Sequence, residues 1–276
     1  MSEFWLTLSF SLIPLLTAFT FSVITPPLGA TLSLRNEILL GIALPPVGSA
    51  VIAAAIILGV PPEATLILYL CAAFVLFLVM ILLPLNVGKK RISMRRRELI
   101  LAALFCIGNT LTMLLMSLSP IVESHFKNLL QGELLAVNRV EFFIALGVAL
   151  ILLIAGIKYR GYLYAYSLDE EGLRIKEKSY NLLTILYRTA STLIITGGLV
   201  LTGPLLTTSL LIVPAFLVER SCRGLDRFVI FTILVGALGT VSGFIVAILV
   251  DLPPAPVAVS MIIILGFCAR MAPGKR

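Results

Sequence analysis

Charged residues are scarce in this chain of 276 residues. Lys, Arg, Asp and Glu together make up 13% of the sequence, whereas hydrophobic residues make up 59%. Soluble globular domains carry about 25% charged residues, so the composition excludes a soluble fold. The mean hydropathy of +1.10 supports the same conclusion. We therefore expect an integral membrane protein.

Residues that build catalytic centres are also few. His125 is the single histidine, which excludes a metal site made from several histidines of this chain. The four cysteines are isolated from one another, and scattered cysteines in membrane helices are usually small packing residues. The glycine-rich phosphate cradle G-x-x-x-x-G-K-[ST] is missing. We predict that the chain is not an enzyme, binds no cofactor, and does not hydrolyse ATP by itself.

Apolar runs, by contrast, recur along the whole sequence. A helix needs about 20 apolar residues to cross the hydrocarbon core of a membrane. By that criterion there are nine candidate spans, at residues 4–30, 38–59, 64–86, 99–119, 140–157, 181–202, 204–219, 228–250 and 255–271. Several are short or interrupted by Gly or Pro, so a count of eight to ten fits. The predicted fold is one all-α membrane domain, residues 1–276, with about nine transmembrane helices.

The basic residues predict the orientation of these spans. All of the 21 Lys and Arg residues except Lys127 and Arg139 fall in alternate loops or, for Arg188 and Arg270, near the ends of spans that adjoin those loops. Loops rich in Lys and Arg stay on the cytoplasmic side of a membrane. We expect the N-terminus outside and the C-terminus in the cytoplasm of a multi-pass protein of the inner (cytoplasmic) membrane. The net charge of +7 follows from this bias, so no nucleic-acid partner is needed.

The polar residues inside the predicted spans are almost all neutral. A proton-coupled carrier would normally need a buried acidic or basic group there. The pattern therefore favours a translocation path that is driven from outside the chain. Breaks in membrane helices free backbone groups that can bind substrate or line a cavity, although a packing kink is the alternative. Candidate pathway residues are Gly41, Pro45 and Pro46 in the second span and Asn109 and Thr110 in the fourth.

Two segments are candidates for contact on the outer face. Residues 120–139 have an apolar i, i+3, i+4 rhythm, which predicts an amphipathic helix at the membrane interface. In this segment Glu123 and His125, with Glu133 nearby, offer oxygen and imidazole donors for a divalent cation, or are simply solvated. Asp251, in VDLPPAP, is either a surface turn residue or a contact for an external binding protein.

A charge-dense turn in VPAFLVERSCRGLDR, residues 213–227, is the main candidate for contact with a cytoplasmic partner. Proline would bend the chain there, and Ser221 or Asp226 is expected to cap a short helix. The alternative is an ordinary basic cytoplasmic loop with no partner. The candidate contact residues are Pro214, Glu219, Arg220, Ser221, Arg223 and Gly224.

Five segments in this order resemble a known family. They are PPLGATLSLRNEILLGIAL, NLLQGELLAV, YSLDEEGLR, LLTTSLLIVPAFLVERSCRG and VGALGTVSGFIVAILVDLPPAPVAV. Together they resemble the manganese, zinc and iron class of ATP-binding-cassette (ABC) importer permeases. The resemblance covers nearly the whole chain. It implies a type II importer-like bundle, paired as a homodimer around a central pathway.

The same resemblance implies the partners. Two cytoplasmic ATPase subunits would dock on the turn near Pro214 to Arg223 and would use the ATP. An extracytoplasmic substrate-binding protein would deliver the cargo. In metal-transporting members, the segment after the Leu-Arg turn resembles G-D-A-L-S-H-A, whose Asp and His are the expected metal ligands. Here Ile42 and Pro46 stand at those two positions, and neither side chain can bind a cation.

The sequence thus supports one leading hypothesis and three alternatives. The leading hypothesis is the permease subunit of an ATP-driven importer for a divalent transition metal or a metal chelate. The first alternative is a permease for an organic or chelated ligand, since Ile42 and Pro46 remove the usual site for a bare ion. The second is a stand-alone secondary carrier or channel. An intramembrane enzyme is the least favoured, because the spans hold no paired catalytic residues.

Overall fold

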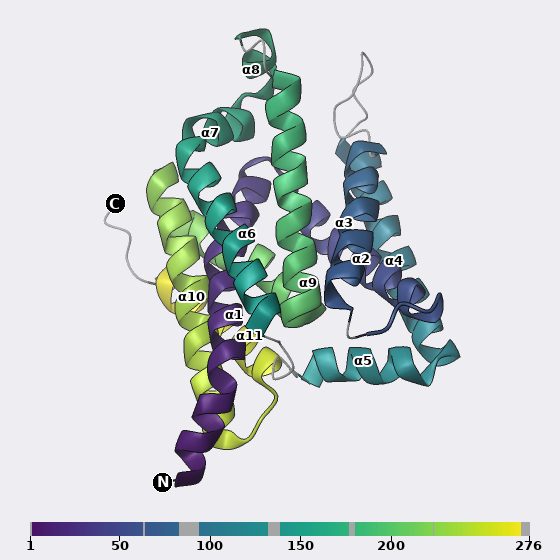
Figure 1. The fold of residues 1–276 in the computed structure, drawn as a ribbon. Coiled ribbons are helices and arrows are strands. Elements are labelled where there is room, and N and C mark those ends of the chain that lie inside the picture. The colour runs from purple at the N-terminus through teal and green to yellow at the C-terminus, as the bar shows by residue number, and fades with distance from the viewer. Residues whose placement is uncertain are drawn as a thin grey trace.

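The structure of the protein, a computed structural model, is helical throughout its described part (Figure 1). It describes residues 2–62, 64–82, 94–131, 139–176, 180–222 and 224–271. The predicted all-α fold class is confirmed for these residues. The elements are α1 (Ser2–Leu34), α2 (Ile38–Ile57), α3 (Thr65–Leu82), α4 (Met94–Leu118), α5 (Pro120–Gln131), α6 (Arg139–Lys158), α7 (Arg160–Leu168), α8 (Glu170–Lys176), α9 (Tyr180–Val218), the 3-10 helix η2 (Glu219–Ser221), α10 (Leu225–Val250) and α11 (Pro254–Met271).

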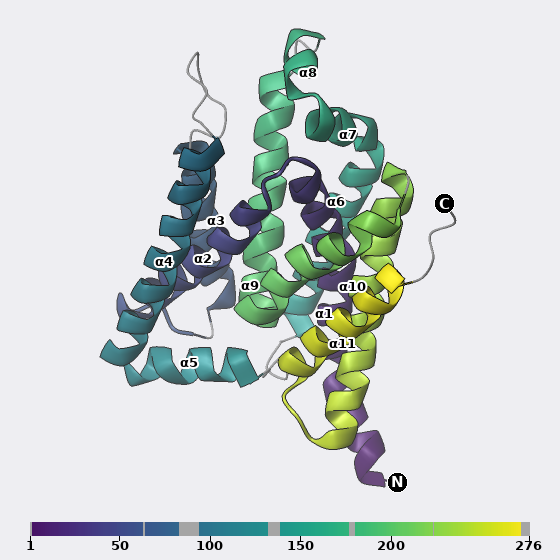
Figure 2. The same ribbon diagram turned by 180° about the vertical axis from the view of Figure 1, so that it is seen from behind.

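The long helices form one bundle with a distinct element at each end. Helix α1 packs against α9 and α10, and α11 packs against α10 and α9. Helix α2 joins this group to α3 and α4. Figures 1 and 2 both show α5 lying across one end of the bundle and α7 and α8 at the other. We call these the α5 end and the α7 end.

Helix α9 is two helices that double back at Gly203. The backbone of Gly203, with φ 82° and ψ 164°, is not helical. A Cβ on Gly198 would lie 2.8 Å from the side chain of Thr207. In a straight helix, residues nine positions apart are about 13 Å apart along the axis. The chain therefore reverses between 180–202 and 204–218, where two separate spans were predicted.

Six helices in the described part are long and apolar enough to cross a membrane, with all of 180–221 counted as one. A seventh is obtained if residues 146–168, bent by 70° between α6 and α7, form one span. Helix α3, at residues 66–82, is apolar but shorter. The predicted count of nine is not established by this criterion and stays a prediction.

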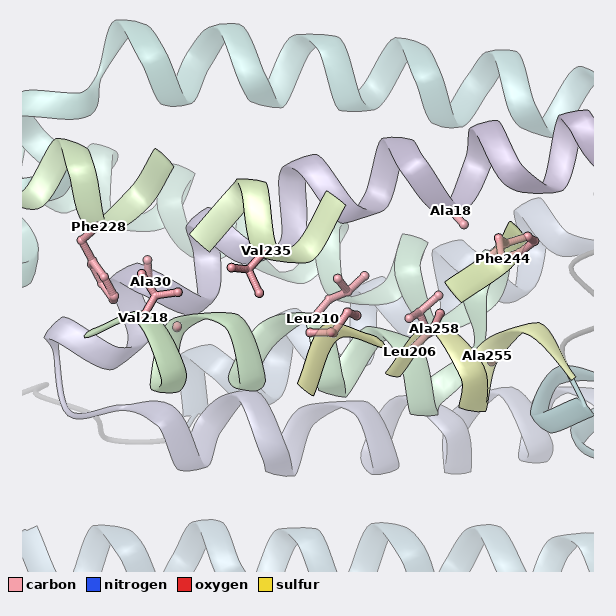
Figure 3. Packing of buried hydrophobic residues seen from close by; sticks show 12 residues of the cluster. Ala18, Ala30, Leu206, Leu210, Val218, Phe228, Val235, Phe244, Ala255 and Ala258 are labelled. Atoms are coloured by element: carbon pink, nitrogen blue, oxygen red, sulfur yellow. The ribbon is translucent and has the colours of Figure 1, made fainter. Parts of the chain in front are cut away.

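The core of the bundle consists of small and apolar side chains. Figure 3 shows one cluster in which α1, the second half of α9, α10 and α11 meet, with Leu206, Leu210 and Phe244 almost fully buried. Where lipid surrounds a bundle, close van der Waals packing rather than the hydrophobic effect joins helices, and small residues allow it. Gly239 and Gly243 of α10 accordingly lie directly against Ile262 and Ala258 of α11.

Three helices end in the same hydrogen-bonded motif. At the end of α1, the Glu37 amide donates to the Leu32 carbonyl and the Asn36 amide to the Ser33 carbonyl, with Asn36 left-handed at φ 54°. This is the Schellman pattern, which satisfies carbonyls that a helix end leaves free. The same i to i−5 bond closes α2 beside Gly59 and α10 beside Asp251. The turn between α1 and α2 is therefore a defined structure.

Candidate functional site

The turn between α9 and α10, described at residues 219–222 and 224, lies at the α7 end of the bundle and is exposed in part. Glu219, Arg220 and Gly224 are exposed, whereas Ser221 is half-buried and Pro214 is fully inside α9. Arg223, also predicted here, lies outside the described residues. The proline can therefore shape this turn but cannot be touched by a partner. Among the described residues of the turn, the exposed charges are those of Glu219 and Arg220.

Side-chain hydrogen bonds tie this α9–α10 turn to its surroundings. The Ser221 hydroxyl donates to the Ala269 carbonyl of α11 at 3.2 Å. The Ser33 hydroxyl of α1 donates to Glu219 Oε2 at 3.4 Å. The Tyr164 hydroxyl of α7 donates to Asp226 Oδ1 at 2.8 Å. The turn and the first turn of α10 are thus attached to α1, α7 and α11.

The predicted cap at the start of α10 is wrong. Neither Ser221 nor Asp226 caps this helix, because the N-cap residue is Gly224 and it has no side-chain hydrogen bond. Asp226 instead lies in the first turn of α10, where a carboxylate interacts favourably with the helix dipole.

An ion-pair cluster lies beside the α9–α10 turn and was not predicted from the sequence. Glu37 Oε1 accepts from Arg35 Nη2 at 3.0 Å and lies 2.5 Å from Arg97 Nη2 of α4. Arg35 also donates through Nη1 to the Tyr166 carbonyl of α7 at 2.7 Å, and its guanidinium stacks 3.8 Å from the Tyr166 ring centroid. We call these four residues the Arg35 cluster.

The Arg35 cluster is well shielded from solvent. The side chains of Arg35 and Glu37 are each 6% exposed, and that of Arg97 is 13% exposed. Burial alone would lower the pKa of the Arg35 guanidinium, but its interactions with Glu37 outweigh that effect and raise the pKa above its ordinary value. Among the side chains that the structure describes, Glu37 is the only buried acidic one.

The predicted pathway residues of α2 are packed against neighbouring helices. Gly41 and Pro45 are buried, and a Cβ on Gly41 would lie 3.4 Å from Leu32 of α1. Pro46 is half-buried against α4, where a Cβ on Gly108 would lie 2.8 Å from the Pro46 carbonyl carbon. The two prolines therefore lie within a continuous α2 that packs closely on both sides.

The predicted pathway residues of α4 lie beside this contact. Asn109 is half-buried and donates within its own helix to the Phe105 carbonyl at 3.1 Å, and Thr110 is exposed. Thr112, which was not among the candidates, donates to the Gly108 carbonyl at 2.8 Å and to the Pro46 carbonyl at 3.4 Å. The structure thus places Pro46 near α4, and it places Gly41 against α1 and α9.

Glu123 and His125 lie on α5, the helix predicted at the outer interface. Two positions along a helix are separated by about 200°, so the two side chains point in opposite directions. Glu123 instead pairs with Lys127 at 2.6 Å, one turn further along. His125 packs edge-on against Phe126, and burial lowers the pKa of its imidazole. The two cannot hold one cation, and Glu133 lies outside the described residues.

Across the described residues, no three His, Cys, Asp or Glu side chains gather into a group that could hold a metal ion. Ile42, where the resemblance implies a ligand in related permeases, is half-buried on α2. The polar groups buried in the described part, other than the Arg35 cluster, are Ser and Thr hydroxyls. Most of these hydroxyls donate to a carbonyl of their own helix, as Thr196 does to Thr192.

Asp251 has a structural role at the end of α10. It is exposed and left-handed, with φ 55° and ψ 46°, in the position where Gly is the usual residue. The left-handed conformation costs a residue with a Cβ about 1–2 kcal/mol.

Replacing Asp251 by Gly should therefore stabilise the protein slightly, by about 0.5–1 kcal/mol after the entropy lost by Gly. Asp251→Val should destabilise it by a similar or larger amount, because β-branched residues disfavour φ above zero. Thermal unfolding of the two purified variants in detergent measures the difference. Equal loss of stability in both would contradict the structural role.

Comparisons with known proteins bear on this arrangement. The model of the ABC 3 transport family matches residues 8–272. No curated protein matches the chain. The chain is similar to one in the structure of PsaBC from Streptococcus pneumoniae in complex with Fab, with a TM-score of 0.81 and 20% identity over 100% of this chain and 97% of the other.

A second structure is of a proposed metal-chelate type ABC transporter in an inward-facing conformation. The TM-score is 0.71 and the identity 18%, over 92% of this chain and 83% of the other. At such identities the likeness shows a shared fold. It confirms the predicted all-α helical bundle.

Proposed function

The chain belongs to the ABC 3 transport family and is an ABC importer permease, and from that premise we propose that it imports a divalent transition metal or a metal chelate. The observation that carries this proposal is the exposed, charged α9–α10 turn at the α7 end of a bundle whose described buried polar groups, apart from the Arg35 cluster, are neutral hydroxyls. Neutral hydroxyls cannot couple transport to protons, and the buried carboxylate of Glu37 is paired with two cations. The energy would come from a partner that binds this turn.

We place the α7 end in the cytoplasm and the α5 end outside. The basic residues of the α7 end, including Arg35, Arg97 and Arg220, support this orientation in the inner membrane. Two ATPase subunits would bind the α9–α10 turns of a homodimer, and a substrate-binding protein would contact the α5 end. ATP is then hydrolysed in the partners, with no cofactor bound by this chain.

A charge reversal in the turn tests the docking directly. We expect Arg220→Glu to reduce the amount of ATPase subunit that copurifies by about tenfold or more, since an anchoring residue contributes about 2 kcal/mol to an interface. The subunits are coexpressed with the permease, and the ratio of bound ATPase to permease is measured.

Lys127→Glu is the matched control for this experiment. It makes the same change of charge at an exposed position of α5, at the opposite end of the bundle, and should leave copurification unchanged. An ATPase that binds the Arg220→Glu variant as well as it binds the unaltered chain would count against docking at this turn.

The chemical form of the cargo is the second part of the proposal. A bare ion requires donors along the pathway, but Ile42 and the half-buried Pro46 offer no side-chain donor. This observation favours an organic or chelated ligand over a free ion within the same importer function. Uptake of radioactive zinc and manganese, offered free and as chelates, separates the two forms.

A further inference from the structure

The Arg35 cluster holds three parts of the bundle together through one carboxylate. Glu37 and Arg35 belong to the α1–α2 turn, Arg97 to the start of α4, and Tyr166 to α7. Both guanidinium groups meet the same oxygen, Glu37 Oε1, and Arg35 additionally binds the backbone of α7. Loss of Glu37 would leave two largely buried cations without this shared partner.

The cluster is also connected to the α9–α10 turn. Ser33, in the last turn of α1, donates to Glu219 of η2. Only the Schellman turn separates Ser33 from Glu37, and its backbone bonds from Asn36 and Glu37 return to Ser33 and Leu32. On the other side, the Thr31 and Tyr187 hydroxyls are 3.0 Å apart and join α1 to the first half of α9. A movement of Glu219 would therefore pull on Ser33, and through the Schellman turn on Glu37 and its ion pairs.

Buried ion pairs are poor contributors to net stability, because desolvation offsets their attraction. Buried charges nonetheless favour the one arrangement in which each has its partner, because separating them leaves an uncompensated charge inside the protein. Here that arrangement fixes α2 and α4, the helices with Pro46 and Asn109, relative to the turn that would bind the ATPase. Apolar side chains would also fill this space, but they would leave the α1–α2 turn free to slide on α4.

We propose that Glu37, with Arg35 and Arg97, is a positioning residue that transmits movement of the α9–α10 turn to helices α2 and α4. This inference rests on the proposed function as an ATP-driven permease. It assigns the coupling to a place distinct from both the docking surface and the pathway. Disrupting the cluster should separate ATP hydrolysis from transport and leave both the docking and the hydrolysis in place.

The experiment compares Glu37→Gln with the unaltered permease, each reconstituted with its ATPase subunits and the substrate-binding protein in liposomes. Three quantities are measured: ATPase copurification, ATP hydrolysis, and uptake of radioactive zinc, free and as its citrate chelate. We expect copurification and hydrolysis to stay within about twofold and uptake per ATP to fall by about tenfold, a usual size for coupling between sites. Glu98→Gln, on the exposed side of α4, is the matched control and should behave as the unaltered chain.

A second variant keeps the inference testable if Glu37→Gln does not fold. Arg97→Gln removes the more exposed of the two cations and leaves Arg35 and Glu37 as a pair with no net charge. We therefore expect it to affect folding less than Glu37→Gln does. We expect it to lower uptake per ATP as well, and Arg97→Lys to restore part of it, because an ammonium group can replace one ion pair. A merely structural role would lower hydrolysis and uptake in proportion and would leave their ratio unchanged.

The outcomes separate this inference from the proposed function. Absence of ATP-dependent uptake by the unaltered complex would count against the proposed function, and with it against this inference. If the unaltered complex transports, and well-folded Arg97→Gln and Glu37→Gln keep its uptake per ATP, the coupling role is overturned and the importer function stands.

Discussion

Gly29→Ala is expected to force α1 away from α9 and so to destabilise the bundle. The added Cβ would collide with the backbone carbonyl of Leu211, in the second half of α9. A backbone atom cannot move aside as the tip of a side chain can, so α1 and α9 must separate. Overpacking of this kind costs about 1–3 kcal/mol, and we expect the melting temperature of the purified protein to fall by about 5 °C or more.

Gly147→Ala is the matched control for that change. Gly147 also lies within a helix, α6, but nothing lies within 4 Å of the position of its Cβ. Alanine is the better helix former by about 1 kcal/mol, so this variant should be as stable as the unaltered chain or more stable. The two variants are compared by thermal unfolding in detergent. Equal melting temperatures would show that α1 and α9 are not in close contact at Gly29.

Gly203→Ala is the second change with a large expected effect. Gly203 has φ 82° and ψ 164°, a region of backbone conformation that is essentially restricted to glycine. Strain there costs about 1–3 kcal/mol, and it falls on the reversal that lets both halves of α9 pack in the core. We expect a lower melting temperature and a smaller monodisperse fraction in size-exclusion chromatography.

Gly156→Ala provides the comparison for the reversal. Gly156 lies in α6, has no positive φ, and has open space around its Cβ position. It should unfold like the unaltered chain. If Gly203→Ala were equally stable, the two halves of α9 would not depend on the conformation of Gly203.

Hydropathy predicted where most helices lie, because the length of an apolar run reflects the thickness of the membrane. The predicted span 38–59 corresponds to α2, and 140–157 corresponds to α6. The two spans predicted at 181–202 and 204–219 correspond to the halves of α9 on either side of Gly203. The end predicted for the span at 157 lies next to the 70° bend between α6 and α7.

The candidate site was predictable only in part, because some of its features depend on contacts between segments that are far apart in the sequence. Charge density identified Glu219 and Arg220, which are exposed. The burial of Pro214 depends on how the second half of α9 packs, which a local pattern cannot report. The Arg35 cluster joins residues far apart in the sequence, such as Glu37 and Arg97, and a charged pair next to a turn otherwise suggests a solvated surface. The one signal in the sequence that could have indicated this cluster was Glu37, an acidic residue beside Arg35 at the junction between two predicted helices.

Uptake that depends on ATP is the most direct test of the central claim. The permease, its ATPase subunits and the substrate-binding protein are reconstituted in liposomes, and entry of radioactive zinc or manganese, free and chelated, is measured with and without ATP. We expect uptake only when ATP, the ATPase subunits and this chain are all present. Equal uptake by the purified chain alone, without ATPase or ATP, would contradict the account and would indicate a stand-alone carrier or channel.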